Sequence, residues 1–120
     1  MNRPLLLPLA ACTEPLLVGG KALGLARLLA GEFPVPSGFC VTTEAYDRTL
    51  RALGLSPTEQ WQAALHSSGA ERQRILSHCC AVIRACDIDE LTAPIIDQAR
   101  QLNLPLHGLW AVRSSATNED

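Results

Sequence analysis

The residues best suited to chemistry lie near the two ends of this 120-residue chain. Towards the C-terminus, the apolar run Leu109–Val112 is too short for a surface helix, and it predicts a buried strand that delivers Arg113 to a sheet edge. The hydroxyls of Ser114, Ser115 and Thr117 follow at once. A guanidinium group offers a planar fork of donors, and hydroxyls and turn amides add neutral donors beside it. The pattern predicts one half of a phosphate site.

A second candidate cation lies in the N-terminal third. Lys21 is the only lysine of the chain, and it follows Gly19 and Gly20 directly before an apolar helical stretch. Paired glycines let the backbone approach a ligand closely, and unpaired amides of a helix's first turn attract anions. The motif is not a Walker A loop, because Pro15 stands where glycine is needed and Ala22 where a hydroxyl would bind Mg²⁺. Lys21 is therefore either a phosphate ligand or a solvent-exposed lysine at a helix start.

Other catalytic arrangements are not indicated. Neither Ser114 nor Ser115 lies in a G-x-S-x-G elbow, so neither is predicted to be a hydrolase nucleophile. Glu119 and Asp120 are interpreted as loop carboxylates, not as metal ligands, and we predict no metal site. The three histidines lie on predicted helices or in a loop, and none is predicted to be catalytic: His66, His78 and His107.

The composition indicates a folded domain in a reducing compartment. Apolar residues make up 48% of the chain and charged residues 18%, which excludes a disordered tail. The net charge of −2, without a basic stripe, predicts neither a nucleic acid nor a membrane as partner. Five cysteines without a C-x-x-C pair favour reduced thiols and a cytoplasmic location. Export as a lipoprotein through Cys12 is a weaker alternative, because Pro4–Ala11 contains two prolines and is short for a signal peptide.

The local patterns predict a small sheet with several packed helices, hence a mixed α/β (α+β) fold. Strands are expected over residues 5–9 and 39–43, and a helix over residues 21–29, opened by the two glycines and stopped by Gly31. Thr43 is expected to cap the next helix. Capping boxes predict three more helices, which begin after Ser56, Ser68 and Asp87 and end near His66, Ala85 and Leu102. The apolar face of the second of these is expected to be buried: Ile75, Cys79, Val82, Ile83 and Cys86.

Three segments together carry a family resemblance: Val18–Leu28 (VGGKALGLARL), Val35–Tyr46 (VPSGFCVTTEAY) and Ala111–Asp120 (AVRSSATNED). In order and spacing they resemble the start of the nucleotide-binding domain in the phosphoenolpyruvate synthase, pyruvate phosphate dikinase and rifampicin phosphotransferase family. The resemblance implies an ATP-grasp fold, of which residues 1–120 would form an incomplete N-terminal lobe in a dikinase domain that binds ATP and phosphoenolpyruvate or pyruvate.

The resemblance also implies roles for individual residues. Lys21 and Arg113 match the family's lysine and arginine that hold the ATP phosphates. Cations fixed on two sides would stabilise the charge that spreads over a transferred phosphoryl group. The Mg²⁺ ligands, the second ATP-grasp lobe and a swivelling domain with the phosphorylated histidine are expected outside this chain. Backbone or hydroxyl groups of five residues are further candidates for the phosphate site: Gly19, Gly20, Ser114, Ser115 and Thr117.

These expectations lead to one main hypothesis of function and two alternatives. The main hypothesis is the ATP-binding portion of a phosphoenolpyruvate synthase-like phosphotransferase, which would be part of a larger enzyme and inactive as an isolated 120-residue chain. The first alternative is an antibiotic kinase similar to rifampicin phosphotransferase. The second is a nucleotide-lobe binding module without catalysis, or a truncated gene product.

Overall fold

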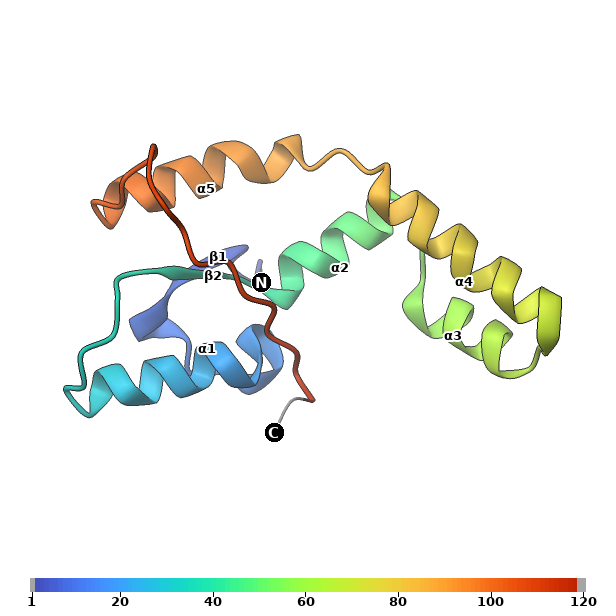
Figure 1. Cartoon of the computed structure of the whole chain (residues 1–120), viewed down its shortest axis with the longest axis horizontal. Coiled ribbons are helices and arrows are strands. Elements are labelled where there is room, and N and C mark those ends of the chain that lie inside the picture. The colour runs from blue at the N-terminus through green and yellow to red at the C-terminus, as the bar shows by residue number, and fades with distance from the viewer. Residues whose placement is uncertain (1, 119–120) are drawn as a thin grey trace. The chain divides into compact units, whose positions relative to one another are not determined.

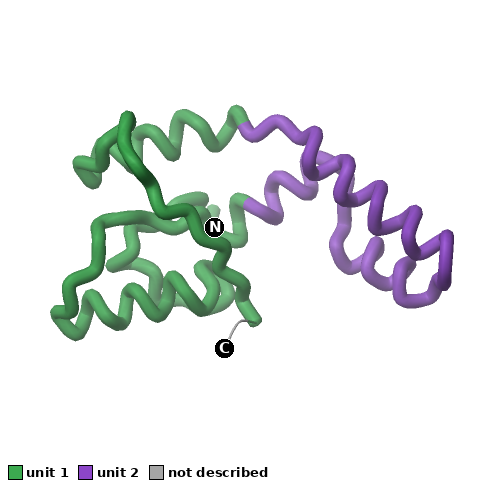
Figure 2. Tube along the Cα trace, viewed as in Figure 1, with its two compact units in different colours: residues 1–45, 89–120 green, residues 46–88 purple. Residues whose placement is uncertain are grey.

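The structure, a computed structural model, describes residues 2–118. These residues form a mostly helical, mixed α/β arrangement with one two-stranded sheet (Figure 1). The chain divides into two compact units, residues 1–45 with 89–120 and residues 46–88 (Figure 2). In chain order the elements are β1 (Leu6–Pro8), the 3-10 helix η1 (Leu9–Ala11), α1 (Pro15–Ala30), β2 (Phe39–Val41), α2 (Thr43–Ala52), α3 (Pro57–Leu65), α4 (Gly69–Arg84) and α5 (Asp89–Gln101).

The first unit is built on the antiparallel pair β1 and β2, in which Leu7 lies opposite Cys40. Thr42 fastens the end of this pair, because its buried hydroxyl donates to the Pro4 carbonyl at 2.6 Å and its amide to the Leu5 carbonyl at 2.9 Å. Helix α1 packs on η1 and on β2. The core between them uses mostly small side chains, which lets the backbones approach closely: Cys12, Leu17, Val18, Ala22 and Ala26.

Helix α1 begins at Pro15, earlier than the predicted start at Lys21, and it contains a kink. Proline is favoured in the first turn of a helix because its missing amide has no helical partner there. Gly19 interrupts the helix with φ 78° and ψ 173°. The paired glycines therefore open a helical segment as predicted, but this segment is the second part of a longer helix. The predicted stop at Gly31 is confirmed.

The prediction of a buried strand at Leu109–Val112 is wrong. The segment has no strand pairing, Leu109 is fully exposed, and Val112 is 89% exposed. A strand requires a neighbour that accepts its backbone hydrogen bonds, and the only sheet within residues 2–118 consists of β1 and β2. Trp110 holds the segment instead: its ring meets Phe39 edge-on with centroids 6.0 Å apart, and its Nε1 donates to the Pro105 carbonyl at 2.9 Å.

The second unit contains most of α2 together with α3 and α4, and α3 packs against α4. Arg72 of α4 donates from Nε to the Ala64 carbonyl at 2.8 Å, and from Nη2 to the Ser67 carbonyl. Carbonyls at a helix C-terminus lack helical partners, so Arg72 satisfies the end of α3.

The apolar face of α4 is less buried than predicted. Cys79, Val82 and Cys86 are only partly buried, and Ile83 is 41% exposed. The nine-residue α3, which packs against the sixteen-residue α4, is the shorter of the two helices.

The predicted helix starts at Ser56 and Ser68 are confirmed, but the predicted capping boxes are not formed. Both serines occupy the N-cap position of their helix, and neither side chain makes a capping hydrogen bond. At α3 the Ser56 amide donates to Oε1 of Gln60 at 2.9 Å, so Gln60 takes the part expected of Glu59.

Candidate functional site

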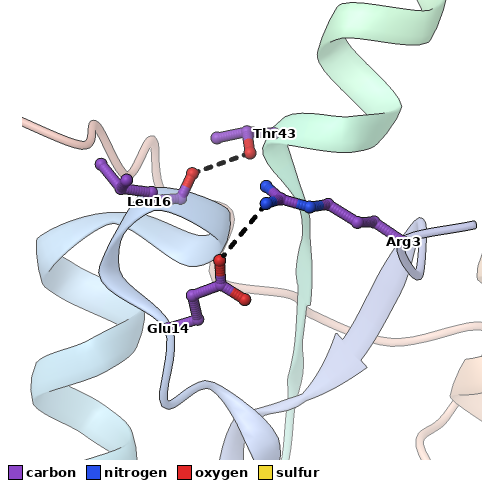
Figure 3. A network of polar contacts seen from close by, with 4 residues as sticks. All are labelled: Arg3, Glu14, Leu16 and Thr43. Carbon is purple, nitrogen blue, oxygen red and sulfur yellow. Dashed lines mark hydrogen bonds and ion pairs between the residues drawn. The ribbon is translucent and has the colours of Figure 1, made fainter. Parts of the chain in front are cut away.

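The two segments that contain the candidate phosphate ligands meet at the kink in α1. An unbroken helix would join the Gly20 amide to the Leu16 carbonyl. In the structure the Gly20 amide donates instead to the Ala116 carbonyl at 3.0 Å, and the C-terminal segment runs past the start of α1 (Figure 1). The Leu16 carbonyl accepts the Thr43 hydroxyl at 2.9 Å (Figure 3). Thr43 therefore holds α1, and its predicted role as the cap of α2 stays a prediction.

Ser115 occupies a second interrupted position in the same helix. An unbroken helix would join the Ala22 amide to the Val18 carbonyl. The Ser115 hydroxyl stands between these two groups, because it donates to the Val18 carbonyl at 2.9 Å and accepts from the Ala22 amide at 3.4 Å. A side chain inserted in this way is a recognised cause of helix kinks. We call the contact of residues 18–22 with residues 115–116 the kink junction.

Gly19 makes the kink junction sterically possible. Its φ and ψ lie in a region that is essentially reserved for glycine. A Cβ at this position would lie 2.5 Å from Oγ of Ser115 and 2.8 Å from the Ala116 carbonyl oxygen. Gly19 therefore allows close approach by another part of the same chain. The prediction that it also admits a ligand stays a prediction.

The kink junction places the two predicted cations on neighbouring pieces of backbone. Lys21 lies between Gly20 and Ala22, whose amides are both held by the C-terminal segment, and its side chain is exposed. Arg113 lies two residues before Ser115 and is also exposed. The helical segment therefore presents an ammonium group, and the adjoining extended segment presents a guanidinium group.

Some of the remaining candidate phosphate ligands are hydrogen-bonded within the protein, and others are exposed. The Gly20 amide and the Ser115 hydroxyl are used within the kink junction. Ser114 and Thr117 are exposed. Sequence reasoning found Ser115 but missed Thr43 and Ala116 as parts of the site. The available signal was the glycine pair inside an apolar helical stretch, which indicates a place where backbone can approach α1.

Arg3 and Glu14 form an ion pair of 3.8 Å close to the bond from Thr43 to Leu16 (Figure 3). Both side chains are more than half exposed, at 57% and 53%. Solvent screens such pairs strongly, so this one adds little to the stability of the kink.

A comparison with known protein families decides the assignment. Residues 15–120 match the family described as the pyruvate phosphate dikinase AMP/ATP-binding domain. The chain belongs to this family. No solved structure matches the chain.

Individual relatives of this AMP/ATP-binding domain agree with the family match. The chain is 31% identical to the "Probable phosphoenolpyruvate synthase" of Staphylothermus marinus over 89% of its own length and 14% of the relative. The protein of the same name from Methanothermobacter thermautotrophicus is 30% identical over 87% and 16%. The "Rifampicin phosphotransferase" of Bacillus cereus is 33% identical over 90% and 13%. The chain thus spans about one-seventh of the length of these curated relatives.

The core of this AMP/ATP-binding domain contains two neighbouring thiols beneath the kink junction. Cys12 is fully buried and its Sγ lies 3.4 Å from the Pro8 carbonyl. The Cys40 Sγ lies 3.7 Å from the Val18 carbonyl, which also accepts the Ser115 hydroxyl. Burial raises the pKa of both thiols, and for Cys12 burial and the adjacent Cys40 bring the pKa to about 11. All five cysteines are free thiols.

The raised pKa of Cys12 predicts a loss of stability in alkali. The folded chain keeps this thiol neutral up to about pH 11, whereas the unfolded chain ionises it near pH 9.0. A folded-state pKa above the unfolded value gives full stabilisation below pH 9, which is lost as the pH rises towards 11. We expect the free energy of unfolding, measured by urea denaturation, to fall across this window. A Cys12→Ala variant should show a shallower fall, and an equally steep one would contradict the assignment.

Two further findings concern the part of the chain that the structure describes. No group of three or more His, Cys, Asp or Glu side chains is placed to hold a metal ion among residues 2–118. Within the same residues, no helix has the length and apolar character needed to cross a membrane. Glu119 and Asp120, interpreted above as loop carboxylates, lie outside the described residues.

Proposed function

We propose that this domain binds the phosphates of ATP with Lys21 and Arg113, as the ATP-binding portion of a phosphoenolpyruvate synthase-like phosphotransferase. The kink junction is the observation that carries the proposal. It joins the helical turn that contains Lys21 to the segment that contains Arg113. Both side chains are exposed. The family match supports a nucleotide as that ligand.

The residues at the kink junction fit the chemistry of a phosphate chain. Arginine grips phosphate oxygens with two parallel donors, and lysine supplies a compact charge on a flexible stem. The exposed hydroxyls of Ser114 and Thr117 can add neutral donors beside Arg113. ATP would supply the phosphoryl group when bound, and the two cations would stabilise its charge. No residue of this chain is assigned a catalytic proton transfer.

The wider assignment is that residues 1–120 form an incomplete N-terminal lobe of an ATP-grasp domain in a cytoplasmic enzyme. The second lobe, the Mg²⁺ ligands and a swivelling domain with an acceptor histidine would lie outside this chain. The much greater length of the relatives supports this division. The 120-residue chain by itself would not turn ATP over.

A second candidate function is an antibiotic kinase. It is favoured by the 33% identity to the rifampicin phosphotransferase of Bacillus cereus over 90% of the chain. The two candidates differ in the acceptor that makes ATP consumption rise in the natural full-length protein. Stimulation by pyruvate would support the synthase, and stimulation by rifampicin would support the antibiotic kinase.

The single lysine provides a direct test of the proposed site. An amine acetylating reagent modifies one side chain in this sequence, and the peptide that contains Lys21 reports its extent by mass spectrometry. We expect Mg-ATP to slow acetylation of Lys21 in the natural full-length protein at least several-fold. Adenosine, which lacks phosphates, is the control and should protect little. Equal acetylation rates with and without saturating Mg-ATP would overturn the role of Lys21.

A further inference from the structure

Four backbone groups of α1 that would pair within an unbroken helix have partners outside α1. A buried polar group without a partner costs free energy, so a kink must be compensated. Here two carbonyls and two amides are satisfied across the chain. The pairs are Leu16 with Thr43, Val18 with Ser115, Gly20 with Ala116, and Ala22 with Ser115. The geometry of α1 around Lys21 is therefore set by distant residues as well as by α1 itself.

Ser115 contributes two of these four contacts, and its hydroxyl proton is already committed. It donates that proton to the Val18 carbonyl at 2.9 Å, and its side chain is half-buried. Its neighbour Ser114 is exposed. The two serines that follow Arg113 thus have different surroundings, and Ser115 belongs to the kink junction.

We infer that Ser115 is a positioning residue, which aligns Lys21 with Arg113 through the hydroxyl that it inserts into α1. This inference rests on the proposed function. Lys21 lies between the two amides that residues 115 and 116 hold, so movement of Ser115 moves the turn that carries Lys21. Arg113 lies on the same short segment as Ser115. The kink junction therefore couples the positions of the two cations.

The coupling has a thermodynamic consequence. A ligand that binds both cations binds best when the kink junction is closed, so the ligand must also favour the closed state. Mg-ATP is expected to slow hydrogen exchange at the Gly20 and Ala22 amides, which the C-terminal segment covers. Loss of the Ser115 hydroxyl removes the hydrogen-bond acceptor of the Ala22 amide directly.

The test compares Ser115→Ala with Ser114→Ala in the natural full-length protein. Hydrogen exchange is followed by mass spectrometry without nucleotide, and Mg-ATP affinity is measured by calorimetry. Ser115→Ala is expected to speed exchange at Gly20 and Ala22 at least tenfold and to weaken Mg-ATP about tenfold. Ser114→Ala should leave the exchange of these amides in the nucleotide-free protein unchanged, because its side chain is exposed.

The outcomes separate the inference from the function on which it rests. Weaker Mg-ATP binding by Ser115→Ala with unchanged exchange would make Ser115 a direct ligand and overturn the positioning role. Unchanged affinity would overturn it as well, provided that Lys21→Ala and Arg113→Ala lose affinity. If those two charge variants bind Mg-ATP as well as the wild type does, the proposed function itself fails. Gly19→Ala, which opens the kink junction by a steric clash and keeps serine at position 115, should reproduce the effects of Ser115→Ala.

Discussion

Replacing Gly19 with alanine is expected to detach the C-terminal segment from α1 and to weaken Mg-ATP binding severely. The backbone conformation at Gly19 costs a residue with a side chain about 1–3 kcal/mol. In addition, the new Cβ would lie 2.5 Å from Oγ of Ser115 and 2.8 Å from the Ala116 carbonyl oxygen, distances that the closed kink junction does not tolerate. Urea denaturation and Mg-ATP calorimetry on the natural full-length protein measure both effects.

Gly24→Ala is the matched control for this prediction. Gly24 lies in the same helix, and a Cβ there meets no atom within 4 Å. Alanine forms helix more readily than glycine, by roughly 0.8–1 kcal/mol per residue, so this variant should be as stable as the wild type or more so. If both glycine variants proved equally stable and bound Mg-ATP equally, Gly19 would have no special part in the kink junction.

Arg113→Ala is expected to weaken Mg-ATP binding by at least tenfold while leaving the stability of the protein nearly unchanged. Hydrogen bonds to charged groups contribute about 1.5–3 kcal/mol, and each 1.4 kcal/mol corresponds to about tenfold in affinity. The side chain is exposed, so its removal leaves no buried group without a partner. Arg113→Lys keeps the charge but loses the planar fork, and it should fall between Arg113→Ala and the wild type.

Arg100→Ala provides the charge-matched control for Arg113. Arg100 lies in the last turn of α5, is exposed, and belongs to the same compact unit. Its removal changes the net charge equally, so it corrects for the general attraction of a cationic surface for ATP. The affinity of Arg100→Ala for Mg-ATP should stay within about twofold of the wild type, because an exposed charge that does not contact the ligand contributes little to binding. Equal losses from both arginine variants would exclude a specific role for Arg113.

Much of the local structure was predictable because it depends on neighbours in sequence. Three kinds of signal depend on contacts over only three or four residues: apolar periodicity, a serine before a helix and a glycine after one. They located α3 and α4 and the end of α1. The glycine pair before Lys21 was predicted to open a helix and instead interrupts a longer one, whereas the three motifs were enough to assign the family. The predicted phosphate ligands, Lys21 and Arg113, follow from residue type and from position in the family motifs.

Two of the errors share a physical cause, because each concerned a partner distant in sequence. Leu109–Val112 has the composition of a strand, yet pairing requires a neighbouring strand that no local pattern specifies. The hydroxyl of Thr43, a residue predicted to cap α2, reaches the Leu16 carbonyl 27 residues away, a contact that no local pattern predicts. The burial of the apolar face of α4 depends on the helix that packs against it, the shorter α3.

The sequence by itself determined where most helices lie and to which family the chain belongs, and it predicted which residues would hold a phosphate. Only the tertiary structure decided that Ser115 enters the hydrogen-bond ladder of α1, 93 residues from Ala22, and that Gly19 gives it room. Residue type and spacing indicate which interactions a side chain can make and which local conformation the backbone adopts. A hydroxyl can serve equally well as a ligand, a cap or an internal brace, and its neighbours in space select among these uses.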